Sequence, residues 1–181
     1  MSYFRGDRAE VEQFVHYWAT IRNVCIPQIV GAYGEDLINS DDAQYVIGQI
    51  RTLYISDSTV TLVLIGRCTH SRRHADWEIK ASLRQGDVYT PNGLLGVLLP
   101  SAGSAAFLPP RFALNWNARN QDCYARYYPT PELAEQLRAW IEDAYEARAS
   151  RAQFILNPAD AMGYNSQCRA CGLTHSLRRR T

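Results

Sequence analysis

Glu78 is the residue of this chain that is best placed to carry out chemistry. It belongs to the segment HADWEIKASL, which follows shortly after an apolar run over residues 59–65 that stops at Gly66. A carboxylate on a helix near the end of a buried strand, beside an aromatic residue, suits chemistry on a sugar or a nucleotide. The helix dipole also favours acidic residues in a first turn whether or not they react, so position alone leaves a plainer interpretation open.

Three further residues surround this position in the predicted fold. His74 precedes Glu78 by four residues and therefore shares its side of the helix, where it can stack on a ligand or donate a hydrogen bond. A surface histidine at a helix start is equally expected. Gly66 leaves backbone open to a ligand, and Arg67 beside it can bind a pyrophosphate, although a solvated basic loop is the commoner explanation.

The N-terminal residues Tyr3, Phe4 and Arg5 are predicted to end the first strand at the same sheet edge as Gly66. An aromatic ring there can pack on a nucleotide base or belong to the core. Only Met1 comes before the SYFR segment. Either the first strand is therefore very short, or the translated start lies downstream of the original one.

The cysteines give a weaker signal. They number five and are mostly scattered, which favours reduced thiols over a disulfide framework. Cys168, Cys171 and His175 have the local spacing of zinc ligands. A fourth ligand would have to be His70, His16 or a distant cysteine, and the sequence does not choose among them. The expectation is a reduced tail and no metal.

Composition and missing motifs exclude several classes. A net charge of +1 provides no basic surface for nucleic acid, and the three arginines at 178–180 are too few to change this. No apolar run approaches the roughly 20 residues of a membrane span, and the N-terminus lacks a signal-peptide core, so we expect a cytoplasmic protein. The chain has no Walker loop, GxGxxG or GxSxG motif, which argues against NTPases, Rossmann oxidoreductases and serine hydrolases.

The elements that must position these residues alternate between helix and strand. Strands are predicted within residues 24–30, at 59–65, at 93–99 and, as one short strand, within 111–128. Helices are predicted at about 7–22 and 40–53, and two more begin at about residue 74 and at Thr130-Pro131. The central two strands are apolar on both faces, as in a covered parallel sheet. This order predicts an α/β fold with a doubly wound, mainly parallel sheet and flavodoxin-like three-layer architecture. We expect one domain over residues 1–149 and a C-terminal extension over 150–181.

The central segment also resembles a known family. The string STVTLVLIG, a basic linker and HADWEIKASL are similar to the TIR-like, ThsB-type signal-producing proteins of Thoeris anti-phage systems, and more broadly to bacterial TIR domains that cleave NAD. The segment SYFRGD resembles the end of the first TIR strand and its loop. The resemblance covers residues 1–100 well and 100–148 loosely, and it departs at His74, where many catalytic TIR domains have tryptophan.

The resemblance implies a TIR-like fold in which Glu78 is catalytic and NAD is a substrate, with no metal required. The residues it places around the nucleotide are Tyr3, Phe4, Arg5, Gly66, Arg67 and His74. Nicotinamide leaves as a neutral group and needs no proton, so one carboxylate suffices to stabilise the cationic ribose, whereas glycosidases generally use two.

The resemblance further implies an ADP-ribose-derived signal, linear or cyclic, that activates a separate effector protein after a phage trigger. It also implies self-association in which a loop from a neighbour completes the site. The loop at residues 31–39, which contains Tyr33, Glu35 and Asp36, is our candidate for that loop, and its composition is equally that of an ordinary surface loop. The alternative is a non-catalytic TIR scaffold that acts only by assembly with partner proteins.

Overall fold

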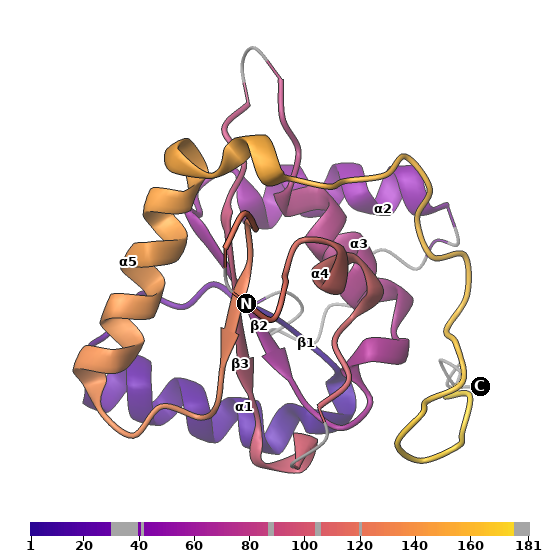
Figure 1. Ribbon diagram of the computed structural model, residues 1–181. Helices are drawn as coiled ribbons and strands as arrows, with labels where there is room; N and C mark the ends of the chain where they lie inside the picture. Colours follow the sequence, from indigo (N-terminus) through magenta and orange to yellow (C-terminus); the bar gives the residue numbers. More distant parts are fainter. Residues whose placement is uncertain (30–39, 41, 87–88, 104–105, 120, 176–181) are drawn as a thin grey trace.

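A parallel sheet forms the centre of the molecule (Figure 1). The computed structural model describes residues 1–29, 40, 42–86, 89–103, 106–119 and 121–175. Within them the sheet has the order β1-β2-β3-β4, with β1 at Ser2–Tyr3, β2 at Val60–Ile65, β3 at Gly93–Leu98 and β4 at Arg126–Tyr128. Every neighbouring pair is parallel, so the carboxyl ends of all these strands meet at one edge.

Helices cover both faces of the sheet. They are α1 (Arg8–Val15) with the π-helical turn η2 (His16–Ile21), α2 (Ala43–Ile50) with η3 (Arg51–Ile55), α3 (Arg73–Ser82), α4 (Pro110–Leu114) and α5 (Ala134–Ser150). One core lies between the sheet and α1 with α5, and a second lies between the sheet and α3 with α4. A third packs α2 on the outer side of α3 (Figure 1). The predicted three-layer α/β architecture is confirmed.

One predicted helix start and one predicted strand are wrong. Residues 24–29 form no strand, because Pro27 lacks an N–H and Asn23 turns the chain with φ of 48°. The last helix begins at Ala134 instead of Pro131, since the Thr130 hydroxyl donates to the Leu98 carbonyl at 2.7 Å. The Asp42 carboxylate caps α2, because it accepts hydrogen bonds from the backbone amides of residues 44 and 45.

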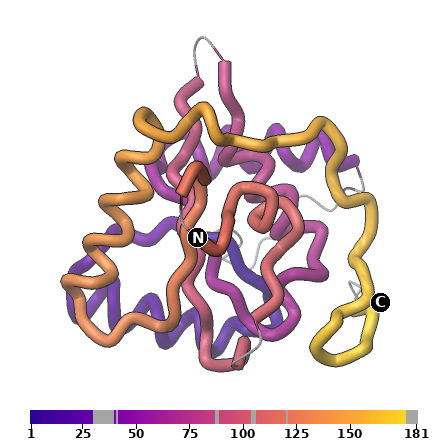
Figure 2. Tube along the Cα trace, in the orientation of Figure 1, coloured from indigo at the N-terminus to yellow at the C-terminus, as the bar shows by residue number. Residues whose placement is uncertain are grey.

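Residues 151–175 run as an extended strap along α3 (Figure 2). The Trp77 indole donates to the Met162 carbonyl at 2.8 Å, and the Lys80 ammonium donates to two strap carbonyls. Asp76 and Arg111 form an ion pair at 3.0 Å, each side chain 4% exposed, and Met162 N–H donates to the same carboxylate. The strap therefore packs on the helix that carries Glu78.

Among the described residues, no helix is both long and apolar enough to cross a membrane.

Candidate functional site

Glu78 lies in the middle of α3, on the side that faces β1. Ala75 and Ile79, its neighbours on the helix, are buried against the rest of the domain and fix the position of α3. The Glu78 carboxyl lies close to the Ser2 hydroxyl and the amino group of Met1. The first strand and α3 therefore meet at this carboxylate.

Burial controls the ionisation of Glu78. Removal of the carboxylate from water raises its pKa from 4.5 to about 7, while the Ser2 hydroxyl and the positive N-terminus act in the opposite direction. Its Oε2 atom is buried and has no hydrogen-bond partner within the described part of the chain. A buried carboxylate oxygen with spare accepting capacity suits a ligand hydroxyl or a developing positive charge.

A pocket of about 590 Å³ opens beside Glu78. Residues 25–28 form one wall, Tyr54 and residues 57–59 form another, and residues 60–62 of β2 lie along it. The pocket exists because β1 pairs only with Val63 and Leu64, which leaves the edge of the first half of β2 open. Its volume lies within the range of about 300–1,000 Å³ that is usual for small-molecule sites.

Comparison with known proteins identifies the domain. The family model described as "Thoeris protein ThsB, TIR-like domain" matches residues 1–104, a span that includes Glu78 and strands β1 to β3. This chain belongs to the ThsB TIR-like family. It is therefore a TIR domain of Thoeris defence and one component of such a system. Neither the curated proteins nor the solved structures contain a significant match.

The other candidate residues of this ThsB-type domain do not line the pocket with Glu78. Tyr3 pairs with Leu64 in the sheet and packs on the core. The Phe4 ring lies 4.0 Å from the Arg72 guanidinium, and Arg5 is exposed in the following turn. His74 lies one turn before Glu78 with its ring 5.0 Å from that of Trp77. The expectation of one shared pocket for these side chains is not met.

The turn after β2 also has different contacts from those expected. The Gly66 N–H donates to the Thr69 hydroxyl at 2.9 Å, and a Cβ on Gly66 would lie 2.1 Å from the Asp7 carboxylate. The absent side chain thus makes room for Asp7, whose carboxylate makes no capping hydrogen bond at the start of α1. Arg67 donates to the Ala170 carbonyl at 2.9 Å and so holds the strap.

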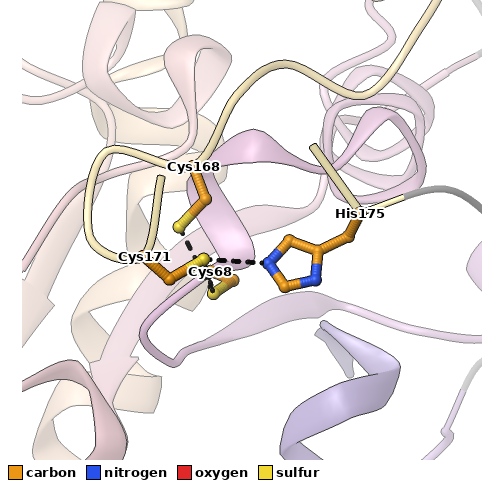
Figure 3. A group of neighbouring side chains, drawn as sticks. All are labelled: Cys68, Cys168, Cys171 and His175. Atoms are coloured by element: carbon orange, nitrogen blue, oxygen red, sulfur yellow. Dashed lines mark hydrogen bonds between the residues drawn. The ribbon is translucent and has the colours of Figure 1, made fainter. Parts of the chain in front are cut away.

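Two functional features escaped the sequence patterns. The pocket depends on the path of residues 25–28, which has no sequence motif, and on the shortness of β1, which the sequence offered as one of two possibilities. Cys68 was not singled out, yet its sulfur lies with those of Cys168 and Cys171 and with the His175 ring, all four ligand atoms within 4.8 Å of one another (Figure 3). The place of Cys68 just beyond the end of β2 was the available signal.

The loop at residues 31–39, with Tyr33, Glu35 and Asp36, and the arginines at 178–180 lie outside the described residues.

Proposed function

We propose that this ThsB-type domain consumes NAD through Glu78 and produces an ADP-ribose-derived signal for Thoeris defence. The observation that carries the proposal is the partly buried Glu78 carboxylate, with its unpaired Oε2, at the wall of a ligand-sized pocket. Membership of the ThsB family supports the same substrate, because the resemblance to NAD-cleaving TIR domains rests on the segment that contains this glutamate.

The chemistry needs one ionised carboxylate. Glu78 accepts hydrogen bonds from the ribose hydroxyls and stabilises positive charge on the ribose as the bond to nicotinamide breaks. The electron pair of that bond passes to the nicotinamide ring nitrogen, which was cationic and leaves neutral. Water captures the ribose and loses a proton, which gives ADP-ribose, or a nucleophile within the same nucleotide closes a ring. No metal and no general acid take part.

The surroundings of Glu78 strengthen its electrostatic effect. The Coulomb interaction between a carboxylate and a developing cation is several times larger in a partly dry site than in bulk water. The Ser2 hydroxyl lies near the carboxyl and is suited to orient it. Ligands of α/β proteins usually bind beyond the carboxyl ends of the parallel strands. In this domain the strap contacts the turn at that end through Arg67. The pocket beside β1 is the cavity that Glu78 lines.

Self-association and a separate effector complete the proposal. The loop at residues 31–39 follows the pocket wall at 25–28 directly in the chain, so its contacts in an assembly would act at this pocket. Activity per subunit should fall on dilution and fall again in Tyr33→Ala and Asp36→Ala. Full activity at high dilution in both variants would show that one chain contains the whole site.

The decisive experiment is product analysis after incubation of purified protein with NAD, with and without infected-cell extract. We expect release of nicotinamide, and Glu78→Gln should lower kcat by about 10²–10³-fold while nucleotide binding remains. Mass spectrometry of the second product separates linear from cyclic ADP-ribose derivatives. Glu142→Gln, which changes an exposed acid on α5, is the matched control and should keep full activity. Equal turnover by the wild type and Glu78→Gln would favour the scaffold alternative.

A further inference from the structure

Four metal-binding side chains meet where the strap crosses the turn after β2. Cys68 comes from that turn, and Cys168, Cys171 and His175 come from the strap about 100 residues later (Figure 3). Their sulfur and nitrogen ligand atoms all lie within 4.8 Å of one another. Cys68 and Cys168 are buried, and the other two are half-buried.

The separations of these atoms match the edges of one tetrahedron. Zinc bonds of about 2.3 Å to sulfur and about 2.0 Å to nitrogen require sulfur–sulfur separations of about 3.8 Å and sulfur–nitrogen separations of about 3.6 Å. The Cys68 sulfur lies 3.3 Å from that of Cys168 and 3.7 Å from that of Cys171. The Cys171 sulfur lies 3.1 Å from Nε2 of His175. These three separations lie within about 0.5 Å of the tetrahedral values, and the remaining ones are no longer than 4.8 Å.

The backbone around the two strap cysteines already has a ligand-holding conformation. The Gly172 N–H donates to the Cys168 carbonyl at 2.8 Å, and Gly172 has φ of 72°, where a side chain would be strained. The backbone N–H groups of Ala170 and Cys171 are directed at the Cys168 sulfur.

Surrounding residues hold the backbone of the strap beside its ligands through hydrogen bonds. Arg67 donates to the Ala170 carbonyl, and His70 Nε2 accepts from the Arg169 N–H at 3.0 Å, which occupies the nitrogen of His70 nearest the strap. The His175 carbonyl accepts from Arg72 at 3.1 Å and from Asn165 at 2.7 Å. His70 is thus a support, and Cys68 takes the fourth ligand position.

We propose that Cys68, Cys168, Cys171 and His175 bind one structural zinc ion that fastens the strap to the turn after β2. Three thiolates and one imidazole in a closed tetrahedron are a set that zinc prefers, and no position remains open for water or substrate. A disulfide would use two of the thiols and leave the third thiol and the imidazole without a role. The zinc site would join the turn at the carboxyl end of β2 to the strap. The strap carbonyls accept hydrogen bonds from Trp77 and Lys80, so the site would also help to hold α3 in place.

The proposal predicts metal content directly. The full chain, purified under reducing conditions from zinc-supplemented cells and desalted, should contain about one zinc per chain by mass spectrometry of the metal. Exchange with Co²⁺ should give the intense visible absorption of a tetrahedral site and a thiolate charge-transfer band. Removal of zinc by a chelator should lower Tm, and readdition should restore it.

Variants separate ligation from packing. Cys168→Ser and Cys68→Ser should reduce zinc content at least tenfold, whereas Cys123→Ala, a change at a buried cysteine outside the cluster, should retain it. If the serine variants do not fold, His175→Cys answers the question, because it should keep one zinc and shift the Co²⁺ spectrum to that of four thiolates.

Three results would overturn the proposal: less than a tenth of a zinc per chain in reduced wild-type protein, iron in place of zinc, or a Co²⁺ spectrum of an octahedral site. Because these readouts do not involve NAD, the zinc site and the proposed enzyme activity are tested independently.

Discussion

Replacement of Glu78 by glutamine should stabilise the fold at pH 8 and have almost no effect at pH 4. The Glu78 pKa rises from 4.5 in the unfolded chain to about 7 in the folded domain because burial disfavours the charged form. Below pH 4.5 the carboxyl is neutral in both states. Between these two values the unfolded chain loses the proton first, so the stability of the wild type falls as pH rises.

The size of the effect follows from that difference. At about 1.4 kcal/mol for each pKa unit, ionised Glu78 costs the folded state about 3 kcal/mol above pH 7. The amide of glutamine stays neutral and nearly isosteric, so Glu78→Gln avoids this cost but must still place its NH₂ group. The gain of about 3 kcal/mol at pH 8 is therefore an upper limit.

Urea unfolding of the wild type, Glu78→Gln and the exposed control Glu142→Gln at pH 4 and pH 8 measures this difference. We expect the free energy of unfolding of Glu78→Gln to exceed that of the wild type only at pH 8, together with the loss of NAD cleavage. A destabilised Glu78→Gln at pH 8, or the same stability difference at both pH values, would refute the view that ionised Glu78 lowers the stability of the fold.

Three further outcomes are expected. The kcat for NAD cleavage should rise with pH through a midpoint near 7, because only ionised Glu78 stabilises the ribose cation, and a flat profile between pH 5 and 8 would contradict this. Gly66→Ala should lower the free energy of unfolding by about 1–3 kcal/mol through its clash with Asp7, and Asp7→Ala in the same chain should recover most of the loss in urea titrations. Asp76→Ala should cost about 3–5 kcal/mol because it leaves buried Arg111 without its carboxylate, and limited proteolysis should then cut the strap first; an uncut strap would show that other contacts hold it.

Local patterns in the sequence were enough to predict the architecture. The unbroken apolar runs at β2 and β3 indicate strands that are covered on both faces, and their alternation with helical segments leads to a parallel sheet. The place of Glu78 on a helix soon after β2 follows from the same patterns. These features depend on neighbours within a few residues, so the chain itself specifies them.

Contacts between distant segments were beyond the reach of those patterns. The complete burial of Trp77 depends on α2, which packs beside it, and on the strap, whose Met162 carbonyl accepts from its indole. The backbone at Gly66 was predicted to face a ligand, but the carboxylate of Asp7, 59 positions earlier in the chain, occupies the space beside it. Each of these outcomes required knowing which segment occupies a given space.

The two candidate sites divide in the same way. The sequence alone singled out Glu78 as the candidate carboxylate and showed that Cys168, Cys171 and His175 have ligand spacing. Only the tertiary structure decided that Glu78 faces a pocket beside the short β1, and that Cys68 completes the cluster. The physical reason is that a side chain's burial, pKa and ligand partners depend on the groups within a few ångströms in space, and chain folding brings those groups together from any distance in sequence.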